Sequence, residues 1–338
     1  MTALKWIFAH TYTYAALALA ALAIYHVGYD LSQLTLWFLI PFYIVSLCAQ
    51  WVLPKVKAPI EKNELKTDII SNLVTLGTVN ALQNIVLGIM FAWASSSLLI
   101  HYGVISPEFG LASAPLWLQS ICAFLIADFF FYVTHRIAHE VPFFWRFHSV
   151  HHCAHRVTFM NAYRVHPIDA MWRRYVPIFF MTLTGLSVEA MAVTVVFSTV
   201  LATVTHMNVD LRHGWLNYVI ATNELHRWHH SKKYDEAKNF ALFTLWDHLF
   251  GTYYWPRDRE LPEKTGLGDE TNYPIHNYWQ QLLIPFRWSR LSDAANSHAT
   301  PNCGEHEQDA NEEASDPILL DNTSDQSHKR KEADTAPV

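Results

Sequence analysis

Three short histidine clusters carry the most distinctive chemistry in this sequence. They are His135-Arg-Ile-Ala-His139, His148-Ser-Val-His151-His152 and His226-Arg-Trp-His229-His230. Residues three and four apart lie on one face of an α-helix, so each cluster can direct its imidazoles toward a common point. With twenty histidines in 338 residues, chance predicts fewer than about one-tenth of one HxxHH pattern, whereas this chain holds two. We interpret the clusters as metal ligands.

The number of imidazoles predicts two metal ions. Imidazole binds iron, zinc, copper and nickel, and the clusters offer about twice as many ligands as one tetrahedral zinc ion uses. His206 is a further candidate, because it ends an apolar stretch and so returns to the membrane boundary beside the clusters. We interpret His155 and His166, in the same segment, as structural residues or as residues that support the ligands without binding the metal. His213 and His248 are weaker candidates still.

Other histidine-based metal sites do not fit the sequence. A membrane zinc protease needs HExxH, but His139-Glu140 is followed by Val-Pro-Phe. Soluble di-iron bundles use Glu-x-x-His pairs, and no glutamate in this sequence has a histidine three residues later. Transmembrane haems take single histidines from within spans, whereas these histidines are clustered. A site made almost wholly of histidine remains.

Apolar runs of membrane-spanning length must position the clusters. About half of the residues are hydrophobic and only 16% are charged, which favours a membrane protein over a soluble one. The first run lacks a small-residue cleavage site, so we expect a retained helix. In the last run, the residues around Gly185 predict two short helices joined by a turn. The runs are Trp6 to Val27, Leu34 to Leu53, Ile69 to Ile100, Leu116 to Val133 and Val176 to Thr205.

Charge placement predicts the orientation of these spans. Four lysines separate the second and third runs, and Arg136, Arg146 and Arg156 follow the fourth, whereas the loop from Gly103 to Pro115 has no Lys or Arg. The positive-inside rule then places the N-terminus and every histidine cluster on the cytoplasmic side. We expect the bacterial inner membrane rather than the endoplasmic reticulum.

The C-terminal segment differs from the rest of the chain. From Ser292 to Val338 it has eleven Asp or Glu and three Lys or Arg, a net charge of −8, so the total of −6 leaves +2 for the remainder. It is poor in apolar residues, and we predict that it is disordered. The four cysteines have no motif spacing, which predicts neither a disulfide framework nor a thiolate zinc site.

At this point the sequence resembles the fatty acid hydroxylase and sterol desaturase superfamily, most closely its bacterial-type sterol desaturase branch. The resemblance runs from about Leu116 to Trp255. Beyond the histidines it includes Asp128-Phe-Phe-Phe-Tyr132, Trp145-Arg-Phe-His148, Asn161-Ala-Tyr-Arg164-Val-His166-Pro167 and Trp246-Asp247-His-Leu-Phe250-Gly251-Thr252. It implies a membrane oxygenase with two non-haem iron ions at the cytoplasmic surface and an apolar tunnel for a lipid. In the family pattern, the position of His206 is also a ligand.

Four polar residues flank the proposed ligands. Asp128 lies two helical turns before His135, where its carboxylate could accept a ring N–H of a ligand. Arg164, His166 and Asp247 are similar candidates for bracing the site. The alternative role for Asp128 is a polar residue that caps the end of its helix. The alternative for Arg164 and Asp247 is an ordinary ion pair on the surface.

Two irons would support O2 activation and removal of hydrogen from an unactivated C–H bond, giving either a hydroxyl group or a double bond. The sequence has no iron–sulfur motif, no dinucleotide fingerprint and no cytochrome b5 segment. We therefore expect a separate ferredoxin or cytochrome b5 type donor with its reductase, docking near Arg146 and Arg156. Nucleic acid is not expected as a partner.

The overall prediction is an all-α integral membrane protein with four to six membrane helices or hairpins and a cytoplasmic helical cap. The alternative function is a metal-binding or metal-transport protein without redox catalysis. The lipid could be a sterol, a fatty acyl chain, an alkylglycerol ether, a carotenoid or a polar headgroup. The predicted divisions are membrane helices over 1–115, a catalytic domain over 116–256, an extension over 257–291 and the acidic tail over 292–338.

Overall fold

The computed structural model of the chain describes residues 3–57, 61–75, 77, 111–262, 264–268 and 272–291. Three predictions fall wholly or largely outside these residues. They concern most of the third apolar run, most of the loop from Gly103 to Pro115, and the acidic tail.

Four helical stretches are long and apolar enough to cross a membrane. They match the first, second, fourth and last predicted runs. Asp30 caps the second stretch, because its carboxylate accepts hydrogen bonds from the backbone N–H groups of Ser32 and Gln33. The stretches are α1 (Ala3–Val27), the continuous helix formed by α2 (Leu31–Leu34), η1 (Thr35–Leu39) and α3 (Ile40–Val52), α7 (Leu116–Glu140) and α10 (Val188–His206).

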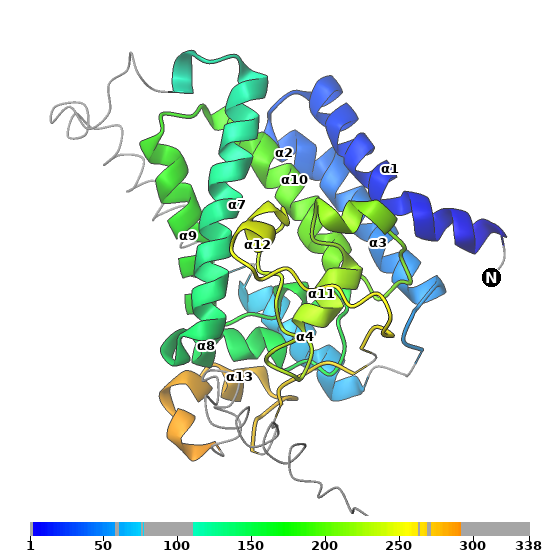
Figure 1. Ribbon diagram of the computed structural model, residues 1–338, viewed down its shortest axis with the longest axis vertical. Coiled ribbons are helices and arrows are strands. Elements are labelled where there is room, and N and C mark those ends of the chain that lie inside the picture. Colours follow the sequence, from blue (N-terminus) through cyan, green and yellow to red (C-terminus); the bar gives the residue numbers. More distant parts are fainter. Residues whose placement is uncertain are drawn as a thin grey trace, which may run out of the picture. The chain divides into compact units, whose positions relative to one another are not determined.

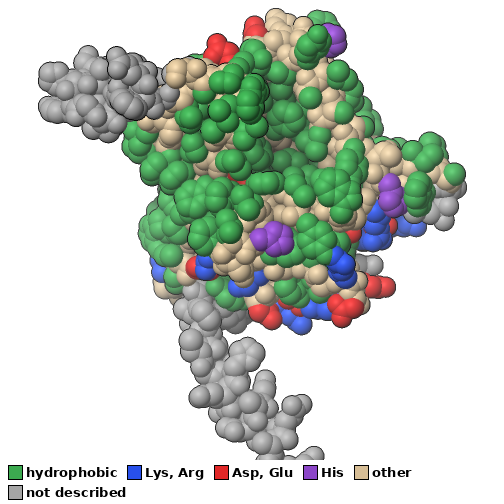
Figure 2. Space-filling view, turned by 45° about the horizontal axis from the view of Figure 1, so that its top comes forward, with side chains coloured by type: hydrophobic (Ala, Val, Ile, Leu, Met, Phe, Trp, Pro, Cys, Tyr) green, Lys and Arg blue, Asp and Glu red, His purple; other side chains and the backbone are tan. Residues whose placement is uncertain are grey.

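In these helices large apolar side chains face outward and polar side chains face inward, which is the arrangement expected in a lipid bilayer. Large apolar groups such as Trp37 and Trp51 face outward, with exposed fractions of 67% and 72%. Polar groups are paired inside, where the Tyr12 hydroxyl lies 2.6 Å from the Ser46 hydroxyl. In Figure 2, hydrophobic side chains cover the upper and middle parts of the face, and most Lys and Arg side chains gather along its lower margin. The chain is therefore an integral membrane protein.

The helices α7 and α10 form the centre of the bundle (Figure 1). Helix α7 packs against α9 (Pro167–Leu183) and α10, and α10 also packs against α1. The predicted turn between α9 and α10 is present, and Gly185 has a φ of +69° there, a conformation that glycine adopts without strain. Both α7 and α10 end in histidine-bearing turns at the same end of the bundle.

Short helices cover that end of the bundle. No β-strand occurs in the described part of the chain, and its two isolated bridges join Pro54 to Val209 and Ile220 to Phe243. The covering helices are α4 (Lys62–Val74), α8 (Pro142–His152), α11 (Asn223–His229), α12 (Leu245–Leu249) and α13 (Tyr278–Gln281). The 3-10 turns are η3 (Leu111–Ser113), η4 (Phe159–Tyr163), η5 (Gly214–Tyr218), η6 (Ile284–Phe286) and η7 (Trp288–Arg290). This arrangement confirms the predicted all-α membrane fold.

Candidate metal centre

The first two histidine clusters are placed by a sharp break between α7 and α8. Helix α7 continues past its apolar span, so His135 and His139 lie on its last two turns. Val141 is extended (φ −104°, ψ 116°), and Pro142 begins α8. Proline is favoured at this first helical position, where its missing N–H leaves no bond unmade. The break lets the second cluster turn back toward the first.

The remaining histidines come from the end of α10 and from α11. His206 is the last residue of α10. Thr222 caps α11 by accepting a hydrogen bond from the Leu225 N–H. Arg227 is buried and donates to the Asn208 side chain over 3.0 Å. Since Asn208 lies two residues beyond His206, this bond fixes α11 beside the end of α10.

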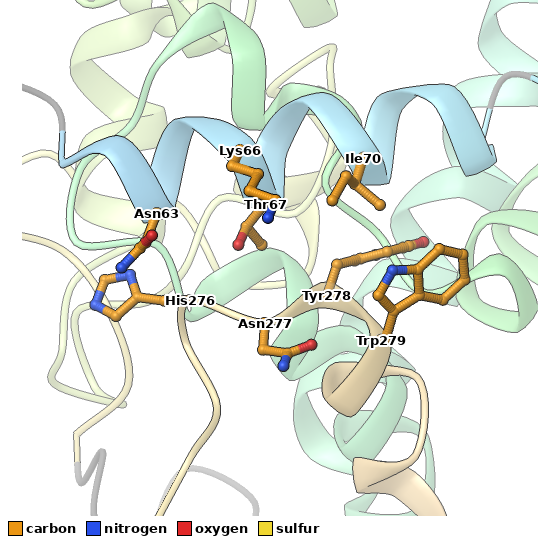
Figure 3. Close-up of a pocket in the computed structure, with 8 residues that line it drawn as sticks. All are labelled: Asn63, Lys66, Thr67, Ile70, His276, Asn277, Tyr278 and Trp279. Carbon is orange, nitrogen blue, oxygen red and sulfur yellow. The ribbon is translucent and has the colours of Figure 1, made fainter.

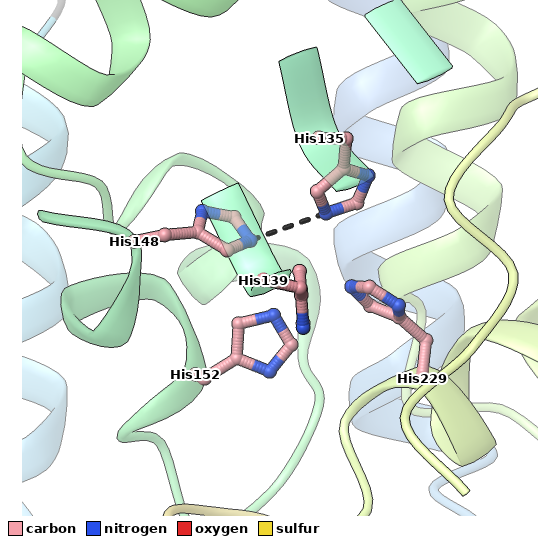
Figure 4. A group of neighbouring side chains, drawn as sticks. All are labelled: His135, His139, His148, His152 and His229. Atoms are coloured by element: carbon pink, nitrogen blue, oxygen red, sulfur yellow. Dashed lines mark hydrogen bonds between the residues drawn. The ribbon is translucent and has the colours of Figure 1, made fainter. Parts of the chain in front are cut away.

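Together these elements bring all nine predicted ligands into two groups. Within each group, one ring nitrogen of every member lies within 4.8 Å of those of the others. All nine side chains are buried. The first group, which we call the five-histidine group, is drawn in Figure 4 and comprises His135, His139, His148, His152 and His229. The four-histidine group comprises His151, His206, His226 and His230.

His135 and His148 face each other through nitrogen atoms that both carry lone pairs. His135 Nδ1 donates to the Phe240 carbonyl over 2.8 Å, and His148 Nδ1 donates to the Asp169 carboxylate over 3.0 Å. Both oxygens can only accept, so in the neutral rings both Nε2 atoms lack a proton. These two atoms are 3.1 Å apart. Facing lone pairs repel unless a cation lies between them, so this pair fits a metal.

The four-histidine group has a similar spacing. His206 Nε2 is 3.3 Å from His151 Nε2 and 2.9 Å from His226 Nε2, which in turn lies 3.0 Å from His230 Nε2. Two nitrogens that each lie about 2.1 Å from one ion, at right angles, are about 3.0 Å apart. The ring of His206 is held by its Nδ1, which donates to the Ala202 carbonyl over 2.9 Å.

Several buried ring nitrogens have no hydrogen-bond partner among the described residues. They are Nε2 of His139, His152 and His229, and Nδ1 of His151 and His230. Buried polar atoms are normally paired, so such a concentration needs an explanation. Burial lowers the pKa of His229 to about 3 and that of His152 well below its usual value. The rings are therefore neutral at physiological pH, which is the form that binds metals.

Asp169 contacts a proposed ligand directly, and sequence reasoning missed it. It lies in the first turn of α9, where its carboxylate accepts from His148 and from Arg173, 2.9 Å away. Burial by itself raises the pKa of Asp169, but Arg173 and His148 outweigh burial and lower the pKa to about 2. The carboxylate is thus ionised and fixes the orientation of the His148 ring. The His166-Pro-Ile-Asp169 helix start was the available clue.

The segment from Lys238 to Phe243 orients two rings of the five-histidine group. His229 Nδ1 donates to the Lys238 carbonyl over 2.8 Å, as His135 does to Phe240. Two carboxylates hold this segment by its backbone. Asp247 accepts from the N–H groups of Phe240 and Ala241 over 2.8 and 3.1 Å, and Asp128 accepts from those of Leu242 and Phe243, each over 2.8 Å.

This geometry corrects the interpretation of Asp128. Its carboxylate binds backbone N–H groups and not the ring of His135, so Asp128 acts on that ring only through the segment that carries the Phe240 carbonyl. Asp247 braces the same segment and also accepts from the Thr252 hydroxyl over 2.7 Å. Burial raises the pKa of Asp247 to about 6, against the effect of these bonds.

Arg164 and His166 lie one layer farther from the rings. The Arg164 guanidinium donates to Asp68, to the Cys153 thiol and to the Ile275 carbonyl. It therefore ties α4 and the C-terminal extension to the residue that follows His152. His166 caps α9 by accepting from the Ile168 N–H over 3.1 Å. Neither side chain has a recorded hydrogen bond to a ring of the two groups.

Other histidines and Arg156 lie outside the two groups. His213 is buried between the Thr13 hydroxyl (2.8 Å) and the Glu224 carboxylate (3.3 Å), and His248 is exposed and stacks on Tyr253. His155 makes a distant edge contact with His276. Arg156 is buried, with its Nε 3.9 Å from a Glu64 oxygen. This burial contradicts the prediction that Arg156 offers a docking surface to an electron donor.

The part of the chain that carries this site is similar to a described family. Residues 120–252 match the family described as fatty acid hydroxylase. This range contains all nine histidines of the two groups. The chain is 33% identical over 174 residues to the ornithine lipid hydroxylase of Rhizobium tropici, covering 51% of each chain.

Alkylglycerol monooxygenases are also similar. The identity is 31% over 178 residues with the Caenorhabditis elegans protein (50% of this chain and 34% of that protein) and 33% over 135 residues with the human protein (39% and 29%). The chain thus spans about half the length of the bacterial relative and about a third of the animal relatives it matches. No solved structure matches it.

Proposed function

We propose that this chain is a member of the fatty acid hydroxylase family, whose model matches residues 120–252, and that it is a membrane oxygenase that hydroxylates a lipid. The observation that carries the proposal is the collection of nine buried imidazoles into two adjacent groups at one end of a membrane bundle. The relatives named above are a lipid hydroxylase and monooxygenases. These names favour hydroxylation over desaturation.

The metal that we propose is iron, with one ion in each group. The five imidazoles of one group and the four of the other are, taken together, more ligands than one ion of any first-row metal uses. Imidazole is a ligand that iron accepts. Two iron ions would supply O2 activation and the removal of hydrogen from a C–H bond. The chain's own residues hold the rings. Carbonyl groups of Lys238, Phe240 and Ala202 and the Asp169 carboxylate fix which ring nitrogen faces inward.

Burial of the site is the second contribution of the protein. His148, His152 and His229 have exposed fractions of 2% or less. Water excluded in this way cannot quench a strong oxidant formed from O2. We propose that a lipid reaches the site from the bilayer, which exposed apolar side chains of α7 and α10 such as Ile121 and Val195 would face. We propose that the catalytic domain spans 116–256 and is followed by an extension over 257–291.

We propose that the site faces the cytoplasm and that electrons come from a separate donor with its reductase. Lys55, Lys57 and Lys62 follow the end of α3, next to the end of the bundle that carries the histidines. This placement supports the cytoplasmic side by the positive-inside rule. Arg146 is partly exposed and remains a candidate docking residue for a ferredoxin or a cytochrome b5 type donor.

Metal transport has less support. A transport pathway needs ligands along the spans, whereas the ligand groups found among the described residues lie where α7 and α10 end. The lipid class is proposed from the relatives. Ornithine lipids and alkylglycerols are the first substrates to test, followed by fatty acyl chains and sterols.

The experiment combines metal analysis with lipid mass spectrometry. Protein purified after expression with added iron is expected to hold about two irons per chain, and expressing cells should contain a lipid heavier by one oxygen atom. His229→Ala should lower both iron and product, whereas the exposed His248→Ala should change neither. Zinc in place of iron, or lipids unaffected by expression with a competent donor, would overturn the proposal.

A further inference from the structure

Two hollows on the described surface differ in charge. One of about 200 Å³ lies between α4 and α13 (Figure 3). Its only lysine is Lys66, and the His276 ring lies 3.6 Å from the Glu61 carboxylate. The opposing charge of Glu61 leaves this hollow without a clear preference for an ion.

The other hollow, which we call the basic hollow, has a volume of about 420 Å³. It lies where the start of α1, the end of α3 and the segment after α10 meet. Its lining combines apolar side chains with three lysines and one aspartate. The lining residues are Lys5, Phe8, Ala9, Val52, Leu53, Pro54, Lys55, Lys57, Val209 and Asp210.

Positive charge is in excess in the basic hollow. Lys55 Nζ lies 2.7 Å from one Asp210 oxygen, and the Arg212 guanidinium lies 3.0 Å from the other. The only carboxylate of the hollow is therefore shared by two cations already. Lys5 and Lys57 are both exposed, and no ion pair is recorded for either of them in the described chain. Two cationic side chains are thus available to an anion.

The basic hollow lies at the membrane boundary. The Lys55 N–H donates to the Asn208 carbonyl over 3.0 Å, and the Arg212 N–H donates to the Ala9 carbonyl over 2.9 Å. These bonds join the ends of three candidate spans at one level. Apolar side chains beside the hollow face outward, and Leu4 and Val52 have exposed fractions of 77% and 73%. A ligand there meets cations on one side and the hydrocarbon of the bilayer on the other.

We propose that the basic hollow binds the phosphate headgroup of an anionic membrane lipid. The phosphate lies between Lys5 and Lys57, and the acyl chains lie along Phe8 and Val52. A phosphate group complements the unpaired lysines, and the acyl chains of the same lipid complement the apolar residues of the lining. This lipid is distinct from the substrate that we propose for the metal site, because the hollow contains none of the nine histidines.

The test measures lipid binding to the purified full-length chain by native mass spectrometry in detergent. The probes are phosphatidylglycerol, phosphatidylcholine and inorganic phosphate. The double variant Lys5→Gln/Lys57→Gln removes the two available cations. Its matched control is Lys62→Gln/Lys264→Gln, which removes two exposed lysines from outside the hollow.

We expect phosphatidylglycerol to bind in preference to phosphatidylcholine, with affinity falling at least about tenfold in the Lys5/Lys57 variant. The control variant should bind like the wild type, and both variants should keep the wild-type metal content. Unchanged binding in the Lys5/Lys57 variant, an equal loss in the control, or no preference between the two lipids would overturn the proposal. So would full displacement of the lipid by inorganic phosphate, which would indicate a site for free anions. Since binding is measured without turnover, a failure here is independent of the proposed enzyme activity.

Discussion

The carboxylate of Asp169 accepts a hydrogen bond from Nδ1 of His148 over 3.0 Å, and both side chains are buried. This bond leaves Nε2 of His148 as the nitrogen that faces the five-histidine group. We predict that Asp169→Leu lowers metal affinity about 10- to 100-fold, the usual effect of removing a partner of a ligand. Competition with a chelator, read out as iron per chain, measures the change.

The conservative variant Asp169→Asn should recover part of this affinity, because an amide oxygen can still accept from His148. Asp258→Asn is the control, since Asp258 is exposed and lies 28 residues beyond His230, the proposed ligand nearest to it in sequence. If Asp169→Leu and Asp169→Asn lose stability equally but keep wild-type affinity for iron, Asp169 serves only the fold.

The two groups predict two separable metal sites. His206→Ala removes a donor from the four-histidine group, and His139→Ala removes one from the five-histidine group. Each variant should retain about half of the wild-type iron, because the other group keeps its donors. Elemental analysis and iron spectroscopy of the folded fraction measure this. Full iron content in His206→Ala would contradict its assignment as a ligand.

Removing the carboxylate of Asp128 or of Asp247 should destabilise the same backbone segment. Asp247→Ala leaves two buried backbone N–H groups without an acceptor, and each such charge-assisted bond contributes about 1.5 kcal/mol or more. We expect a loss of about 3 kcal/mol, seen as a lower melting temperature in detergent, together with a weaker hold on iron.

Asp128→Ala should act in the same direction, and the double variant should lose less than the sum of the two effects, because both residues hold one segment. Asp258→Ala, at an exposed position, should leave the melting temperature unchanged. Strict additivity would show that the two carboxylates act independently.

His213 provides a test of histidines that stabilise the fold without binding metal. Its ring, in the segment before α11, joins α1 to α11 through Thr13 and Glu224. We expect His213→Ala to lower the melting temperature, because it leaves the buried Glu224 carboxylate with fewer partners. The iron content of the folded fraction should stay at the wild-type value. A loss of iron as large as that of His139→Ala would instead place His213 in the metal site.

Local spacing made the grouping of the nine histidines predictable from the sequence. Histidines three and four residues apart can be recognised in the sequence because they lie on one face of a helix. The end of an apolar run places His206 beside them. The same holds for the four apolar spans and for the turn at Gly185, where the pattern is continuous along the chain.

Contacts between distant segments could not be predicted. Asp128 accepts hydrogen bonds from backbone N–H groups 114 and 115 residues away. Every residue except proline has such an N–H group, so the sequence does not show which of them a distant carboxylate will bind. Asp169 reaches His148 across a turn and a helix start. Arg156 has the composition of a surface cation, and only the packing of Glu64 against it shows that it is buried.

The backbone from Phe240 to Phe243 has each of its four N–H groups fixed by a carboxylate of the protein itself. Neither carboxylate belongs to the two histidine groups, so this support exists before any ion arrives. The segment that orients His135 and His229 is therefore held in place by protein groups alone, so metal binding does not have to build this part of the site.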